Sequence, residues 1–124
     1  MTKPNYWVVG AMWSGYKDQS EKFIRRGYWY LGYKGDDQSD QQKRRDQIRP
    51  GDRIASKRML GRGSPQIEIR ALGIVREIDD KDKRIYVDWL VRGLKRKVPG
   101  HGCFASVHGP FTEDEDWTKD VFRI

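Results

Sequence analysis

The sequence contains a single cysteine, Cys103, and no long apolar run. One thiol forms no disulfide within the chain and supplies too few ligands for a cysteine-based zinc site. No segment combines the length and hydropathy of a signal peptide or of a membrane span. These absences favour a cytoplasmic protein, and we expect neither a membrane nor a metal ion among its partners.

Sequence motifs of the common enzyme classes are also missing. The chain has no glycine-rich nucleotide loop, no paired-histidine metal helix and no nucleophile elbow. The aspartates of residues 79–82 fall in a polar linker between two apolar segments, where carboxylates are usually solvated. His101 and His108 flank Cys103 in a glycine-rich segment, so a thiolate–imidazole pair is one catalytic alternative. We therefore predict a binding domain with no catalytic residue and no cofactor.

Positive charge is what the chain has in excess. Its 124 residues carry a formal net charge of +7, and its length suits one domain spanning residues 1–124. The densest basic stretches are residues 43–62 and 92–97, whereas residues 113–124 hold five acids and two bases. A solvated basic surface is the simpler interpretation, but this charge also suits a polyanionic partner, so we expect nucleic acid.

Apolar periodicity predicts a fold made mainly of strands. Residues 5–11 form an apolar run that ends in glycine and predict a buried first strand. Residues 66–78 and 84–92 alternate apolar and polar side chains on either side of a polar linker, which predicts a hairpin. Buried alternating positions are expected at Ile67, Ile69, Ala71 and Val75, and at Ile85, Val87, Trp89 and Val91. Shorter strands are expected at 28–33 and 53–57.

Helices are few and short in this pattern. Asp18 and Glu21 have the spacing of an N-cap and its capping-box partner, and Gly27 is placed to end the helix. Residues 34–47 lack apolar side chains and predict a loop or an exposed helix. A last strand or loop is expected at 103–111, followed by a helical turn. The expected fold is α+β: a small, strongly bent antiparallel or mixed β-barrel with one or two short helices.

Two tryptophans flank the first predicted helix and suggest a pocket for a planar ligand. Trp13 lies just past the first strand, and Trp29 lies just past the helix, so the two indoles can approach from opposite sides. Asp18 is placed to accept a hydrogen bond from an exocyclic amine, and Ser14 to donate one to a base edge. The alternative for Trp29 is core packing opposite Leu31. The other tryptophans are expected in the core or as anchors of the chain end: Trp7, Trp89 and Trp117.

Several of these segments together resemble a known family. The stretches "YWVVGAMWSGYKDQSEKFIRRGYW", "IRPGDRIASKR" and "ALGIVREI" are similar to EVE-type domains of the PUA/YTH-like superfamily, especially those at the N-termini of McrB-like restriction GTPases. The resemblance covers about residues 5–92. It implies a small β-barrel that holds one flipped, modified base in an aromatic pocket, while a separate domain or subunit, a nuclease or a GTPase, performs catalysis.

Site residues follow from the resemblance and from the basic stretches. The resemblance implies that Trp13 is a wall of the pocket and Asp18 a polar contact, with Trp29 or Tyr30 as second wall; Ser14 and Gly15 complete the expected base-binding set. It implies backbone contacts from Lys57 and Arg58. The two basic stretches add the remaining candidates for phosphate contact: Arg62, Arg96 and Lys97.

The sequence therefore predicts a nucleic-acid reader that flips a modified base of DNA. The expected base is methylated or hydroxymethylated cytosine, or methylated adenine, and the expected context is a restriction system. Two alternatives remain. One is an RNA-binding PUA/YTH-like module, and the other is an ASCH-like ribonuclease that would need a lysine or arginine and a tyrosine.

Overall fold

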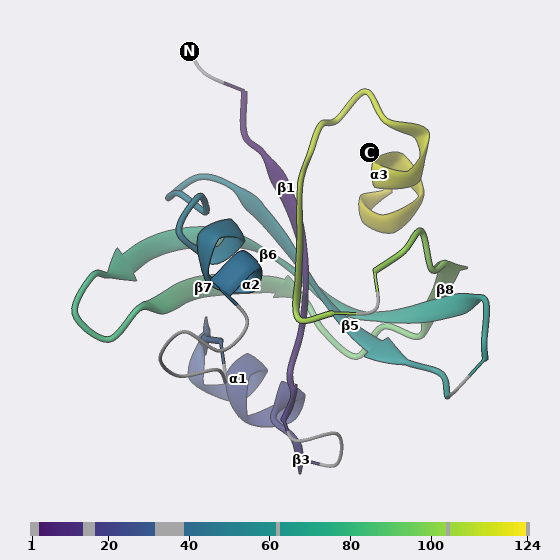
Figure 1. Cartoon of the computed structure of the whole chain (residues 1–124), viewed down its shortest axis with the longest axis horizontal. Coiled ribbons are helices and arrows are strands. Elements are labelled where there is room, and N and C mark those ends of the chain that lie inside the picture. The colour runs from purple at the N-terminus through teal and green to yellow at the C-terminus, as the bar shows by residue number, and fades with distance from the viewer. Residues whose placement is uncertain (1–2, 14–16, 32–38, 62, 104, 124) are drawn as a thin grey trace.

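The described residues form a small α+β fold (Figure 1). The computed structural model describes residues 3–13, 17–31, 39–61, 63–103 and 105–123, with the side chains of residues 12, 13, 17 and 39 outside the description. Its strands are β1 Tyr6–Gly10, β2 Met12–Trp13, β3 Lys17–Asp18, β4 Tyr28–Trp29, β5 Arg53–Met59, β6 Gln66–Asp79, β7 Arg84–Val91, β8 Arg96–Pro99 and β9 Val107–Phe111. Its helices are α1 Ser20–Arg26, α2 Ser39–Arg45 and α3 Asp116–Phe122.

Seven of these strands make one mixed sheet in the order β4-β7-β6-β5-β1-β9, with β8 also paired to β6. β1 and β5 run parallel, and the ribbon β2–β3, α1, β4 and α2 lie between them in the chain. Two parallel strands need a long crossover connection between them, and these elements form it. The α+β prediction is thus confirmed. No ladder joins β4 to β9 among the residues described, so the expected closed barrel is not confirmed.

β1 is buried on both of its faces and separates two apolar cores. Trp7 and Val9 belong to the first core, which Phe23 of α1 and Ile48 beyond α2 cover. Val8 points to the opposite face, into a second core that α3 covers with Trp117 and Val121. In Figure 1, α3 lies on one side of β1, and α1 and α2 lie on the other. The predicted first strand is therefore confirmed, as are the core assignments of Trp7, Trp89 and Trp117.

The β6–β7 hairpin also follows the sequence prediction. Its turn is held by Asp79 Oδ1, which accepts hydrogen bonds from the backbone N–H groups of Lys81 at 2.9 Å and Asp82 at 3.2 Å. The predicted inward positions are buried except Val91, which is 40 % exposed, so that assignment is wrong. β6 is also long enough to pair with β8, a strand that the sequence pattern does not predict.

α1 begins differently from the prediction. Its N-cap is Gln19, and no side chain caps the helix, so the predicted capping box is wrong. Asp18 Oδ1 instead accepts a hydrogen bond from the Ser20 N–H at 2.9 Å. Gly27 ends the helix as predicted: its φ of 77° is left-handed, and its N–H donates to Phe23 O. The strand expected over 28–33 is limited to β4 in the described residues.

The expected elements of the C-terminal third are present as strand β9 and helix α3. Of the helices in the described ranges, none is long and apolar enough to cross a membrane.

Candidate nucleic-acid interface

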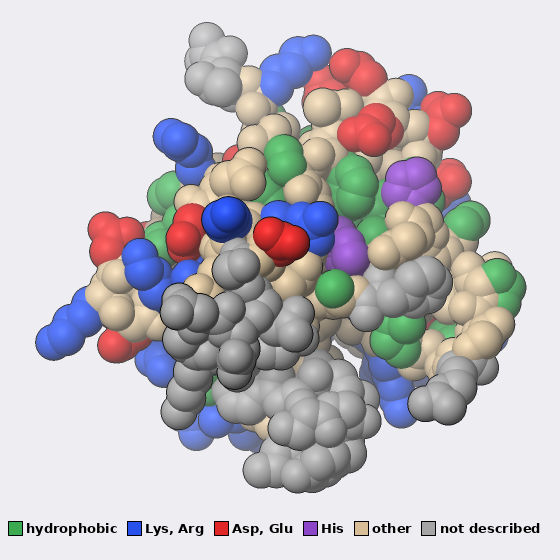
Figure 2. Space-filling view, in the orientation of Figure 1, with side chains coloured by type: hydrophobic (Ala, Val, Ile, Leu, Met, Phe, Trp, Pro, Cys, Tyr) green, Lys and Arg blue, Asp and Glu red, His purple; other side chains and the backbone are tan. Residues whose placement is uncertain are grey.

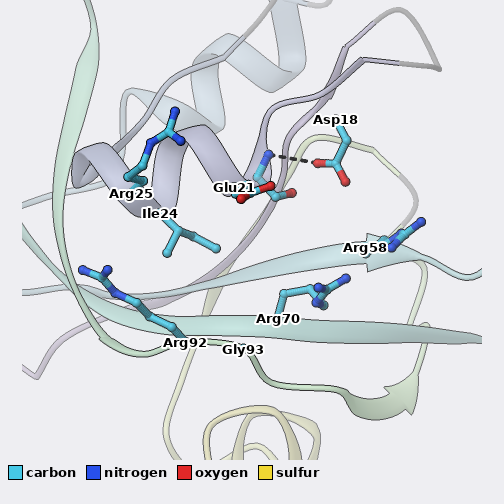
Figure 3. Close-up of a pocket in the computed structure, with 9 residues that line it drawn as sticks. Asp18, Glu21, Ile24, Arg25, Arg58, Arg70, Arg92 and Gly93 are labelled. Atoms are coloured by element: carbon cyan, nitrogen blue, oxygen red, sulfur yellow. Dashed lines mark hydrogen bonds between the residues drawn. The ribbon is translucent and has the colours of Figure 1, made fainter.

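Four arginines from different parts of the fold line one pocket of about 470 Å³. Arg25 lies on α1, Arg58 on β5 and Arg70 on β6, and Arg92 follows β7. Figure 3 shows the two strand arginines and Arg92 on one side of the hollow, with α1 above them. The arrangement collects cationic groups that are far apart in the sequence, and arginine binds phosphate through two parallel N–H groups.

A β-bulge in β6 positions Arg70. Ser56 pairs with Ala71 and Lys57 with Ile69, so Arg70 is an extra residue between them, and its buried neighbours belong to different cores. Arg70 Nη1 forms an ion pair with Glu68 at 3.3 Å, while its Nε is buried without a hydrogen-bond partner. The ion pair thus holds the guanidinium in place, and its Nε–H donor is left without a partner.

Acidic groups occupy the α1 side of the same pocket. Asp18 and Glu21 line it together with Ser20 (Figure 3). The Asp18 carboxylate is exposed and uses one oxygen to accept the Ser20 N–H. The structure therefore places Asp18, one of the predicted base contacts, beside the arginines rather than in a separate aromatic slot.

A second pocket, of about 440 Å³, continues the basic surface. Arg25 and Arg92 line both pockets, and the second adds Arg26 and Arg76. Arg76 lies 3.6 Å from Asp88, and both side chains are more than half exposed, so this ion pair holds its charge weakly. We call the combined surface the arginine face; its residues are Arg25, Arg26, Arg58, Arg70, Arg76 and Arg92.

The prediction that Trp29 forms the second wall of the aromatic pocket is wrong. Trp29 is 1 % exposed and packs in the first core, with its indole N–H donating to Gly10 O at 2.9 Å. Neither face of that ring is open to a base. Tyr30 is half-buried among aromatic rings, 4.9 Å from Phe23 between centroids, and the Arg84 guanidinium lies 5.3 Å from the centre of its ring. Tyr30 therefore belongs to a Tyr–Arg cluster at the β4–β7 edge.

The remaining pocket candidates lie mostly outside the description. Ser14 and Gly15 are outside the described residues, as is the Trp13 side chain. The backbone of Trp13 is described: β2 pairs with β3, so that Trp13 lies opposite Lys17 and Met12 opposite Asp18. This register brings the Trp13 backbone within one residue of Asp18, which lines the arginine pocket.

Lys57, expected on the phosphate backbone, is buried instead. Its side chain is 4 % exposed, and Nζ lies 3.6 Å from the sulfur of Met59. Lys57 follows Ala55 on one face of β5, as Gly10 follows Val8 on the paired strand β1. Strand alternation therefore directs Lys57 to the side of the second core, in which Val8 and Ala55 lie. The prediction for Arg58, the next residue, agrees better with the structure, because its exposed side chain lines the arginine pocket.

The other basic candidates also differ from expectation. Arg96 is half-buried, and its Nη1 donates to Val121 O at 2.6 Å, so it anchors the end of α3 rather than facing a phosphate. Lys97 is exposed on β8 but does not line the arginine face. Arg62 lies outside the described residues.

The geometry does not favour the thiolate–imidazole alternative. Burial raises the pKa of Cys103 to about 11, so the thiol is protonated at neutral pH. Burial lowers the pKa of His108 to about 4, and its Nε2 accepts the Ala105 N–H at 2.9 Å. His101 is stacked on Trp117, with ring centroids 4.6 Å apart. In the parts of the chain described, no three His, Cys, Asp or Glu side chains are grouped to hold a metal.

Sequence reasoning named three members of the arginine pocket nowhere as site residues: Arg25, Arg70 and Arg92, although Arg92 begins the basic stretch 92–97. One signal was available for Arg70, because the alternation of β6 assigns even-numbered residues to the face opposite Ile67 and Ile69. Arg25 and Arg92 reach the pocket through the packing of α1 and the end of β7 against the sheet, which no local pattern encodes. Comparisons with protein-family models, curated proteins and solved structures gave no match to this chain.

Proposed function

We propose that this chain is a nucleic-acid-binding reader domain, in which the arginine face binds phosphates and the segment around Trp13 holds a flipped base. The pocket formed by Arg25, Arg58, Arg70 and Arg92 is the observation that carries the proposal. Guanidinium groups bind phosphate bidentately, and released counterions drive such binding. The net charge of +7 adds long-range attraction for a polyanion.

The base-holding half of the proposal depends on Trp13. The β2–β3 register supports it by linking the Trp13 backbone to Asp18 at the edge of the arginine pocket. A phosphate on the arginines and a base beside Trp13 would then belong to neighbouring parts of one strand. Flipping a base costs a few kcal/mol, and stacking on an aromatic ring returns about 1–3 kcal/mol.

The resemblance of the sequence to EVE-type domains implies the same function. It adds a finer expectation for the fold, a bent PUA-like barrel in which the base enters at the end of the first strand. It also adds the context of a restriction system, in which a partner domain or subunit cuts the DNA. Methylated or hydroxymethylated cytosine and methylated adenine are the candidate bases.

RNA is the alternative ligand, because guanidinium–phosphate contacts do not distinguish RNA from DNA. A ribonuclease is a weaker alternative. It would need a lysine or arginine near a tyrosine. The described residues offer two such groups: Arg84 beside Tyr28 and Tyr30, and Arg76 beside Tyr86.

The test is equilibrium binding to duplexes that differ only in one base: unmodified, methylated or hydroxymethylated cytosine, and methylated adenine. Arg58→Ala combined with Arg92→Ala should weaken binding to every duplex by about 10–100-fold, because two charge-assisted contacts are lost. Trp13→Ala should instead lower the ratio of affinities for modified and unmodified duplexes about tenfold, while salt-sensitive binding persists.

The matched control replaces Lys81 and Lys119, two exposed lysines on the β6–β7 turn and on α3, by alanine. This variant loses the same charge as the double arginine variant and should bind as the wild type does. Equal affinity of the wild type for all duplexes would overturn the reader function, and tighter binding to single-stranded methylated RNA would favour the alternative. Turnover of RNA by the purified chain would point to the ribonuclease.

A further inference from the structure

Lys57 is a buried cation for which the described structure provides no oxygen acceptor. Its side chain is 4 % exposed, and the hydrogen-bond partner of its ammonium is the Met59 thioether, at 3.6 Å. An ammonium has three donors, and thioether sulfur is a weak acceptor. A buried charge is normally paired and hydrogen-bonded, and the Lys57 ammonium keeps donors for an oxygen acceptor that the described residues do not supply.

The groups around Lys57 do not neutralise it. Cys103 is the titratable group whose field acts on Lys57, and burial keeps that thiol protonated. His108 is close enough to feel both Lys57 and Arg44 of α2, and these two cations together help to keep the imidazole neutral. No carboxylate contributes at this place among the described residues. The site is therefore electropositive and suits an electron-rich oxygen.

Lys57 also lies against the strand that leads to Trp13. In the β1–β5 ladder it pairs with Gly10, the last residue of β1, two positions before β2 begins. A Cβ added to Gly10 would lie 3.3 Å from Nζ and 3.8 Å from Ala105 O, so the absence of a side chain at residue 10 leaves room for the ammonium. The charge thus sits against the segment that continues into Trp13.

We propose that Lys57 Nζ donates a hydrogen bond to a carbonyl oxygen of the bound base, so that the site selects a carbonyl-bearing base over adenine. This assignment rests on the proposed function. The phosphate is held by the exposed arginine face, which leaves the buried lysine for the base edge. Cytosine, thymine, uracil and guanine present a carbonyl oxygen, whereas adenine presents ring nitrogens beside an amino group whose N–H faces the cation. Among the candidate bases, modified cytosine is therefore the expected ligand.

The first test compares Lys57→Met with Arg58→Ala, its exposed neighbour on β5. Wild-type protein should bind the duplex with methylated or hydroxymethylated cytosine about tenfold or more tightly than the duplex with methylated adenine. Lys57→Met should lose that preference. Arg58→Ala should lower the affinity for both duplexes by the same factor and keep the preference.

The second test is the pH dependence of wild-type binding between pH 6.5 and 9.5. Burial lowers the pKa of Lys57 to about 8, and a carbonyl acceptor favours the charged amine, so affinity should fall as pH rises above about 8. Cys103, with a pKa of about 11, and His108, with a pKa of about 4, keep one protonation state through this range. The fall should be absent in Lys57→Met, whose folding is checked by its melting temperature.

The outcomes separate the two proposals. No binding to any duplex at low salt would overturn the proposed function. Binding with an unchanged cytosine preference in Lys57→Met, or a wild-type preference for methylated adenine, would overturn the lysine assignment alone. A pH profile that is flat in wild type would also overturn it, even if Lys57→Met failed to fold.

Discussion

Asp52 and Lys57 belong to one short segment and are both buried, but they differ in how many hydrogen bonds their charged groups make. Asp52 accepts hydrogen bonds from the Trp7 indole at 2.9 Å, from the Arg49 N–H at 3.0 Å and from the Asn5 N–H at 3.1 Å. Its carboxylate joins β1 to the turn before β5, and these three hydrogen bonds within the fold satisfy its charge. Lys57 has no comparable set of acceptors. Burial alone therefore does not show whether a charge is satisfied by the fold, whereas the count of hydrogen-bond partners does.

The unpaired state of Lys57 predicts an unusual stability profile for the free protein. Because its folded pKa is about 8 and its ordinary value is 10.5, the native state loses this proton before the unfolded state does. The free energy of unfolding should therefore rise as pH increases through 8, by about 1 kcal/mol between pH 8 and 9. Lys57→Met should show no such rise and should be more stable than wild type at pH 7. Urea unfolding at each pH measures both.

The comparison between the two proteins is needed because Cys103 acts in the opposite direction. Its folded pKa of about 11 exceeds the ordinary 9.0, so its contribution to stability is lost as pH rises from about 9 to 11. Both proteins retain this thiol, and the difference between them isolates the lysine. Parallel profiles from pH 7 to 9 would show that Lys57 is not a buried, unpaired cation.

At the same scale, the sequence predicts burial well where strands alternate regularly and poorly where they do not. The residues of β1 and the inward positions of β6 are buried as expected, because their apolar pattern matches the pleat. Lys57 follows Ala55 on the same face of β5, but a lysine at that position gives no sign that the face is buried there. The burial of Trp29 was left open by the sequence, since a tryptophan after a helix suits both a core and a pocket.

Among the elements, the β6–β7 hairpin was predictable and β8 was not. The hairpin has long alternating strands and a polar turn, so local pattern and tertiary pairing agree. β8 spans four residues and buries Val98 alone, so its pairing with β6 depends on the length of β6 rather than on its own sequence. The α1 start was mispredicted because Asp18 is already paired in β3, which moves the N-cap to Gln19.

The close approach of β6 and β7 depends on Gly73, which has no side chain. A Cβ at Gly73 would lie 2.6 Å from Val87 Cγ1 and 2.7 Å from Asp88 O, and the second of these is backbone that cannot rotate away. Gly73→Ala should therefore lower the free energy of unfolding by about 1–3 kcal/mol. Arg76→Ala, at an exposed position on the same strand, should change it by less than about 0.5 kcal/mol. Equal unfolding midpoints in urea would contradict the predicted close approach.

On the scale of the whole molecule, charge is distributed unevenly in a way that no single segment reveals. The arginine face draws on α1, β5, β6 and the end of β7, whereas residues 113–124, which include α3, hold five acids and two bases. Figure 2 shows acidic side chains at the top of the view, near the place of α3 in Figure 1, and further ones at the left. Composition predicts a polyanionic partner. It does not predict which arginines converge, because their convergence depends on long-range packing of the helix against the sheet. The basic stretches identified in the sequence contain Arg58 and Arg92 but neither Arg25 nor Arg70.

This uneven distribution predicts that the position of a charge, rather than the net charge, sets the salt dependence of binding. Each arginine that contacts a phosphate releases about one counterion, so Arg25→Ala or Arg58→Ala should reduce the slope of log affinity against log salt by about 1. Lys119→Ala on α3 and Lys81→Ala on the β6–β7 turn change the net charge equally and should leave the slope unaltered. Binding isotherms from about 50 to 200 mM salt measure these slopes. If all four variants lowered the slope by the same amount, attraction would depend on total charge, and the arginine face would have no special part in binding.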